Sequence, residues 1–135
     1  MRRYLVVANQ TAGGTHLAEA IRERLAGDSS TFHLVVPATP PGHLATWTEG
    51  QALSIAEDRL HQALTTFKDL AAEATGEVGD ANPFDAIADA LLEGEFDEII
   101  LSTLPAGVSR WLKQDLVSRV ERHWNVPVTH VVAEP

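Results

Sequence analysis

Short apolar segments alternate with segments of helical periodicity along the whole chain, and this alternation limits the possible folds. The predicted strands are residues 4–9, 32–36, 77–79, 99–101 and 128–132. The predicted helices are residues 15–26, 49–75, 83–93 and 110–124. Strands that alternate with helices form a parallel sheet covered by helices on both faces. The sequence therefore predicts one α/β domain, residues 1–135, with a three-layer, doubly wound parallel sheet.

Residues that cap or end helices set the boundaries of these segments. Thr15 and Ser109 are plausible N-caps, and Asn82 stands directly before a proline that suits the first helical position. Apolar residues keep a helical period through 49–75, and Gly76 is expected to end that helix. This interpretation leaves room for only a very short strand after Gly76.

The composition excludes several classes of protein. The chain has 135 residues, of which 44% are hydrophobic, and no cysteine, so disulfides and thiolate metal sites are impossible. A net charge of -9 argues against general binding of nucleic acid. The first apolar run is too short for a signal peptide or a membrane span. We therefore expect a cytoplasmic protein that binds neither nucleic acid nor membrane.

The stretch from residue 96 to residue 115 predicts a buried strand, a loop of small residues and a helix. In open α/β sheets, ligands lie beyond the carboxyl ends of the strands. If the chain reverses direction across the sheet after its third strand, the loop after the first strand faces this one. The candidate ligand site is then Asn9, Gln10, Thr11, Val36, Pro37, Ser102, Thr103, Gly107, Ser109 and Arg110. An ordinary connection with nothing bound has the same local pattern.

Familiar catalytic and nucleotide-binding motifs are missing from the chain. There is no GxxxxGK[ST], no GxGxxG after the first strand and no GxSxG, and the six histidines form no i,i+4 pair. We therefore predict no catalytic and no metal-binding residues. Hydroxyl groups and Arg110 at the start of the last helix could still hold a phosphate-like anion.

Three segments together resemble one family. They are YLVVANQT at residues 4–11, VGDANPFDAIADALLEGEFDEIILST at 78–103 and LVSRVERHWNVPVTHVV at 116–132. The chain resembles a universal stress protein domain, within the adenine-nucleotide α-hydrolase-like superfamily, over its whole length. The resemblance implies a five-stranded, Rossmann-like sheet of order 3-2-1-4-5. It also implies a homodimer, commonly formed through the last strand, Val128 to Val132.

The sequence departs from this family where its ATP-binding members carry G-2x-G-9x-G-[ST]. Ser102 stands near the first glycine, Leu104 or Pro105 near the second, and Gln114 and Asp115 at the final pair. Asp115 would repel phosphate, and Asn9 replaces the family's nucleotide-contacting aspartate. The resemblance therefore implies a small regulatory or ligand-binding module that does not bind ATP in the usual way. Two alternatives remain: a ligand-free dimeric interaction module, and a nucleotide- or anion-binding enzyme of the same superfamily.

Overall fold

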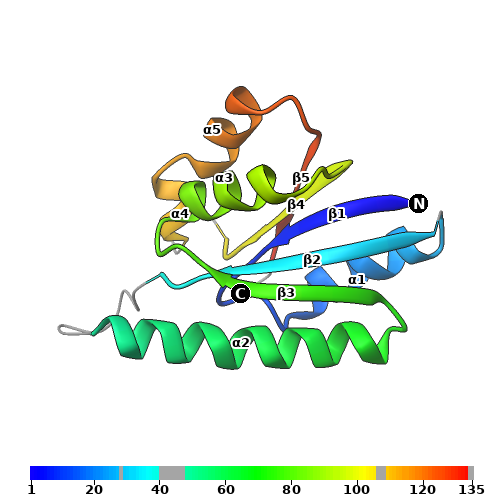
Figure 1. Ribbon diagram of the computed structural model, residues 1–135, viewed down its shortest axis with the longest axis horizontal. Helices are drawn as coiled ribbons and strands as arrows, with labels where there is room; N and C mark the ends of the chain where they lie inside the picture. The colour runs from blue at the N-terminus through cyan, green and yellow to red at the C-terminus, as the bar shows by residue number, and fades with distance from the viewer. Residues whose placement is uncertain (28, 40–47, 106–108, 134–135) are drawn as a thin grey trace.

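A single parallel sheet organises the computed structural model (Figure 1), which describes residues 1–27, 29–39, 48–105 and 109–133. Its five strands are hydrogen-bonded in the order β3-β2-β1-β4-β5, which confirms the predicted topology. The strands are β1 (Arg2–Val7), β2 (Ser30–Pro37), β3 (Glu73–Gly79), β4 (Glu98–Thr103) and β5 (Val128–Val132). The central strand, β1, is buried from Tyr4 to Val7, as expected for a strand covered on both faces.

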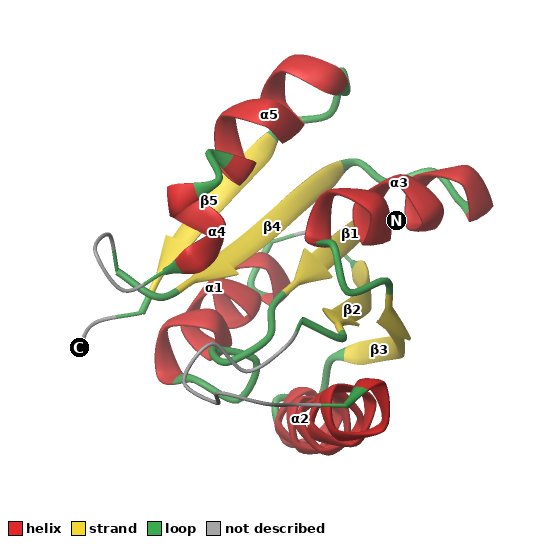
Figure 2. Ribbon diagram, turned by 90° about the vertical axis from the view of Figure 1, so that its left-hand side faces the viewer, coloured by secondary structure: helices red, strands yellow, loops and turns green. Residues whose placement is uncertain are grey.

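Helices cover the sheet in two layers (Figure 2). The helices are α1 (Thr15–Leu25), α2 (Glu49–Asp69), α3 (Pro83–Glu93), α4 (Arg110–Lys113) and α5 (Leu116–His123). The helices α1 and α2 lie on one face, and α3, α4 and α5 lie on the other. Side chains alternate along the strands, so Val6 packs under α1 and α2 while Leu5 and Val7 pack under α3 and α5. None of the described helices is long and apolar enough to cross a membrane.

The helix α2 ends earlier than the sequence predicts. It stops at Asp69, and Ala71 then adopts a left-handed backbone with φ 62°. The Ala71 amide donates to the Lys68 carbonyl and the Ala72 amide to the Phe67 carbonyl, each at 2.9 Å. These two bonds form a Schellman motif, which normally has glycine at the left-handed position. The predicted helix to residue 75 is therefore wrong, because the chain ends α2 with an alanine at this position.

Beyond the end of α2, residues Glu73–Gly79 form β3, which pairs with β2 from Thr31↔Glu73 to Pro37↔Gly79. Gly76 lies in the middle of this strand and does not end a helix. A Cβ at Gly76 would stand 2.6 Å from the Leu60 side chain of α2 and 3.1 Å from the Leu34 carbonyl oxygen. Glycine is needed here because α2 lies so close to the strand.

The other helix boundaries are partly as predicted. Asn82 caps α3 by accepting hydrogen bonds from the Phe84 and Asp85 amides. Thr15 is not a cap but the first residue of α1, whose N-cap is Gly14. The predicted helix over 110–124 is wrong, because the chain breaks it between α4 and α5. Asp115, with φ 56°, lies at this break and is the N-cap of α5.

Candidate functional site

Polar side chains meet where β1 and β4 end side by side. The hydroxyl groups of Thr11 and Ser102 are 2.5 Å apart and share a hydrogen bond, although the two residues are 91 positions apart in sequence. Both are buried. The predicted approach of the loop after β1 to the end of β4 is therefore confirmed.

The amide of Asn9 connects the end of β1 to β2 and to α2. Its Nδ2 donates to the Pro37 carbonyl oxygen at 2.6 Å, and its Oδ1 accepts a hydrogen bond from an Nη of Arg59. Asn9 is 7% exposed, so its side chain is held almost entirely by these protein groups. Arg59 of α2 thus reaches the predicted ligand site.

Arg59 is the site residue that the sequence analysis missed. Between Glu49 and Glu98 the only arginine or lysine residues are Arg59 and Lys68. This scarcity of basic residues was the one sequence feature that could have pointed to Arg59 as a site residue. A helical period shows that a residue faces the sheet side or the solvent side, but it does not show how far a long side chain reaches along the sheet.

The charge of Arg59 has no carboxylate partner among the described residues. Its guanidinium donates a hydrogen bond to the neutral amide of Asn9, and burial lowers the pKa of this guanidinium. Arginine remains protonated at neutral pH despite such a shift. The carboxyl end of the sheet therefore holds a partly desolvated cation whose fork of donors is only partly used by the residues described.

Thr103 lies on the opposite face of the sheet from Ser102, because neighbouring residues of a strand alternate. Its hydroxyl donates to the Leu104 carbonyl oxygen at 2.9 Å and lies 2.8 Å from Nε2 of His130 in β5. Burial lowers the pKa of His130, and the nearby Glu121 partly opposes this shift. The structure therefore separates Thr103 from the hydroxyl pair of Thr11 and Ser102.

The remaining predicted site residues have different surroundings. Ser109 is buried, and its Oγ accepts from the Leu112 amide at 3.2 Å, as expected of the residue before α4. Val36 lies in the core and Gln10 is exposed. Gly107 lies outside the described residues, as does the side chain of Arg110. Since α4 has only four residues and Ser109 already bonds to it, the start of this helix offers less to an anion than the sequence suggested.

The described part of the site has the chemistry of a binding site for a polar or anionic ligand. It offers hydroxyl groups, an amide and one guanidinium. Nowhere in residues 1–27, 29–39, 48–105 and 109–133 do three or more histidine, aspartate or glutamate side chains come together to hold a metal ion.

Comparison with known proteins finds similarity in structure only. The sequence matches no protein-family model and no curated protein sequence. A universal stress protein family member from Burkholderia pseudomallei superposes with a TM-score of 0.68 and 13% identity, over 96% of this chain and 94% of that one.

Two similar structures contain nucleotides. The universal stress protein from Archaeoglobus fulgidus in complex with dAMP has a TM-score of 0.66 and 18% identity, over 97% of this chain and 98% of that one. A universal stress protein in complex with cAMP has a TM-score of 0.60 and 17% identity, over 96% of each chain. With its strand order and its layers, the chain has the universal stress protein fold.

Proposed function

We propose that the chain is a cytoplasmic, universal stress protein-like regulatory module that binds a small phosphate-bearing ligand at the carboxyl end of its sheet. The observation that carries this proposal is Arg59. Its guanidinium reaches Asn9 at the end of β1, where ligands of doubly wound sheets lie, and no described carboxylate neutralises it. A phosphate group would supply the missing negative charge and accept from the fork of Arg59.

The proposed ligand carries one phosphate group and is not ATP bound in the usual way. Similar folds hold dAMP and cAMP. At the end of β4 and just beyond it, Ser102 stands near the first glycine of the ATP-binding members of the family, and Leu104 or Pro105 stands near the second. Without glycine, the backbone cannot approach a triphosphate as closely.

Titration calorimetry with AMP, Mg-ATP and inorganic phosphate tests this proposal. We expect AMP to bind more tightly than Mg-ATP, and Arg59→Gln to weaken AMP binding by about tenfold or more, because a charge-assisted hydrogen bond is lost. The matched control is Arg122→Gln, since Arg122 is a 69% exposed arginine on α5. Equal AMP binding by all three proteins would refute the role of Arg59, and tight Mg-ATP binding would refute the choice of ligand.

We also propose a homodimer through β5. This strand is an edge of the sheet and contains Val128, Val131 and Val132, of which Val132 is 41% exposed. An open apolar edge favours pairing with another strand, and a two-fold axis would pair it with its copy.

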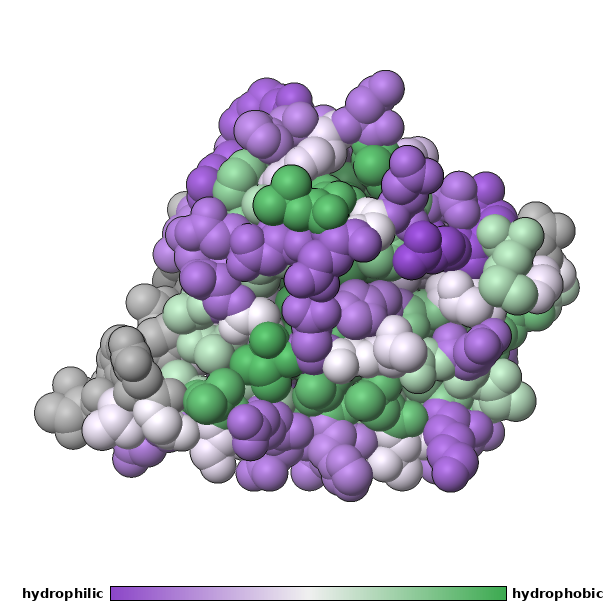
Figure 3. Space-filling model, viewed as in Figure 1, coloured by the Kyte–Doolittle hydropathy of each residue, from purple (hydrophilic) through white to green (hydrophobic). Residues whose placement is uncertain are grey.

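The other edge strand of the sheet, β3, is the control for this proposed interface. A row of hydrophobic side chains also shows between α2 and β3, on a face that is otherwise largely polar (Figure 3). Sedimentation should show a dimer that Val132→Lys dissociates and that Thr75→Lys, on the β3 edge, does not. A monomer at micromolar concentration, or dissociation by Thr75→Lys alone, would contradict the interface through β5.

A ligand-free dimeric interaction module is the second candidate. It is favoured by the hydrogen bond shared between Thr11 and Ser102 and by the one from Asn9 to Pro37, because both join residues of the site to each other. Native mass spectrometry of freshly purified protein separates the two candidates, since it reports the oligomer and any retained nucleotide together. Turnover of a bound nucleotide would instead support an enzyme of the superfamily.

A further inference from the structure

A pocket lies at the opposite end of the sheet from Arg59. It has a volume of about 330 Å³ and is lined by Arg2, Tyr4, Glu23, Arg24, Gly27 and Glu98. Arg2 and Glu98 begin neighbouring strands, and the other charged residues come from the last turn of α1. Its size is at the lower end of the range for small-molecule sites.

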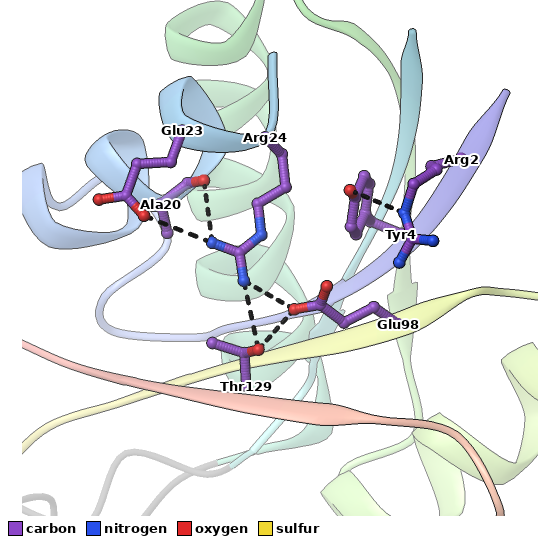
Figure 4. Close-up of polar contacts among 7 residues, drawn as sticks. All are labelled: Arg2, Tyr4, Ala20, Glu23, Arg24, Glu98 and Thr129. Atoms are coloured by element: carbon purple, nitrogen blue, oxygen red, sulfur yellow. Dashed lines mark hydrogen bonds and ion pairs between the residues drawn. The ribbon is translucent and has the colours of Figure 1, made fainter. Parts of the chain in front are cut away.

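One wall of the pocket is a rigid charged network (Figure 4). An Nη of Arg24 donates to Oε2 of Glu98 at 2.7 Å and to Oγ1 of Thr129 at 3.2 Å, and the Thr129 hydroxyl donates to the same Oε2 at 2.5 Å. The side chains of Arg24 and Glu98 are only 18% and 13% exposed. Among the described residues, Arg24 and Thr129 both donate to Oε2 of this carboxylate, so Oε1 of Glu98 keeps its capacity to accept from a ligand.

The opposite wall is formed by Tyr4 and Arg2. Tyr4 is 5% exposed, its ring stacks on Phe32 at 5.1 Å between centroids, and its hydroxyl accepts from Nε of Arg2 at 3.2 Å. Within the described residues, no group accepts the Tyr4 hydroxyl proton or the terminal Nη protons of Arg2. This wall therefore presents donors and one positive charge, whereas the other wall presents Oε1 of Glu98 as an acceptor and holds two glutamates, Glu23 and Glu98, against one arginine, Arg24.

We propose that this pocket binds a small zwitterion such as a free α-amino acid. Its carboxylate would accept from the Arg2 fork and the Tyr4 hydroxyl, and its ammonium group would donate to Oε1 of Glu98. Glu23 and the carbonyl end of α1 add negative potential on the ammonium side. The proposal is independent of the phosphate ligand at the other end of the sheet.

The two charges of the ligand explain why a zwitterion fits better than a simple ion. Arg24 already compensates Glu98, so a lone cation would meet the field of two arginines, and a lone anion would meet two carboxylates. An amino acid places opposite charges on opposite walls, and each wall then gains a charge-assisted hydrogen bond.

Calorimetry with L-serine, acetate and ethylammonium tests the ligand class. We expect saturable binding of L-serine and at least about tenfold weaker binding of either half-ligand, because each satisfies one wall only. Absence of saturable L-serine binding at millimolar concentration would overturn the proposal. Equal binding of acetate and L-serine would show a plain anion site and would also overturn it.

Variants on one strand test the placement. Arg2→Gln should weaken L-serine binding by about tenfold or more, and Tyr4→Phe should weaken it severalfold while keeping the ring stacked on Phe32. The matched control is Arg3→Gln, because Arg3 is the next arginine of β1 and its guanidinium lies instead over the Phe96 ring at 5.1 Å. Arg59→Gln should also leave L-serine binding unchanged. Equal weakening by Arg2→Gln and Arg3→Gln would overturn the assignment, as would amide NMR shifts away from the first residues of β1 and β4.

Discussion

The two ends of the sheet hold basic side chains in opposite ways. At the amino end, Arg24 lies 2.7 Å from the carboxylate of Glu98, and Thr129 bonds to both. At the carboxyl end, Arg59 bonds to the amide of Asn9 and His130 to the hydroxyl of Thr103, both neutral partners, and burial lowers the pKa of both bases.

This difference separates stabilisation from binding capacity. A partly buried charge that has its counterion and its hydrogen bonds fixes the elements that carry it. A desolvated base with neutral partners stabilises the fold less and keeps its attraction for an anion. The Arg24–Glu98–Thr129 network therefore clamps α1 to β4 and β5, while Arg59 at the carboxyl end keeps its charge for a ligand.

The largest expected effect is from breaking the clamp at the amino end. Glu98→Ala leaves Arg24 partly buried with only the exposed Glu23 carboxylate, 3.6 Å away, and should lower the free energy of unfolding by about 2 kcal/mol in urea titration. The double variant Arg24→Met with Glu98→Leu should lose less than Glu98→Ala alone, since it leaves no unpaired charge. If the double variant loses more stability than Glu98→Ala, an unpaired Arg24 charge is not the reason why the single substitution is destabilising.

A smaller loss is expected when only the bridging hydroxyl of the clamp is removed. Thr129→Val keeps the shape and the β-propensity of the side chain but loses the bonds to Arg24 and Glu98. The free energy of unfolding should fall by about 1 kcal/mol, the net value of a typical hydrogen bond. Thr31→Val, on β2, is the comparison for the substitution itself, and an equal loss there would contradict a role for the network.

The burial of His130 predicts that the stability of the fold decreases in acid. Because burial lowers the pKa of His130 below its ordinary 6.5, the unfolded chain binds more protons than the folded chain just below that pH. The contribution of His130 to the free energy of unfolding is therefore largest above pH 6.5. It decreases as the pH drops from 6.5 toward the pKa of His130 in the folded protein. Urea unfolding from about pH 8 to about pH 5 should show a shallower acid-side loss for His130→Gln than for wild type. His61→Gln, on the exposed side of α2, should keep the wild-type slope, and matching slopes in all three would remove His130 as the cause.

The smallest expected effect on stability is that of Arg59. Arg59→Met keeps an apolar stem against the sheet and removes an uncompensated cation, so the free energy of unfolding should change by less than about 0.5 kcal/mol or increase. A loss as large as that of Glu98→Ala would make Arg59 a structural residue and would break the comparison between the two ends.

The β3 strand shows how much a sequence pattern can reveal and how it can mislead. Residues 73–79, EATGEVG, alternate polar and apolar, and Ala74 and Val78 do pack toward the α2 face. That alternation was a strand signal, but the helical period before it extends as far as Thr75 in the same sequence. The left-handed Ala71 ends the helix, and no glycine marks that position. Pairing with β2 over seven residues then decides in favour of a strand.

The candidate site was predictable only in part. That Thr11 approaches Ser102 follows from strand order, because the ends of β1 and β4 are neighbours in the sheet. That Thr103 contacts His130 and not Thr11 follows from the alternation of side chains along β4, which places Ser102 and Thr103 on opposite faces of the sheet. The reach of Arg59 to Asn9 depends on where α2 sits along the sheet, and local sequence does not contain that information.

The order of strands and helices, the bounds of β5 and the Asn82 cap of α3 could be predicted from local sequence, since these features depend on residues close together in the chain. The tertiary structure alone decided the break at Asp115, the Arg24–Glu98–Thr129 clamp and the contact of Arg59 with Asn9. The clamp joins residues 74 and 105 positions apart, and Arg59 meets Asn9 across 50. Such contacts form only once α1 and α2 have packed on the sheet, because helix position and side-chain reach together select the partner.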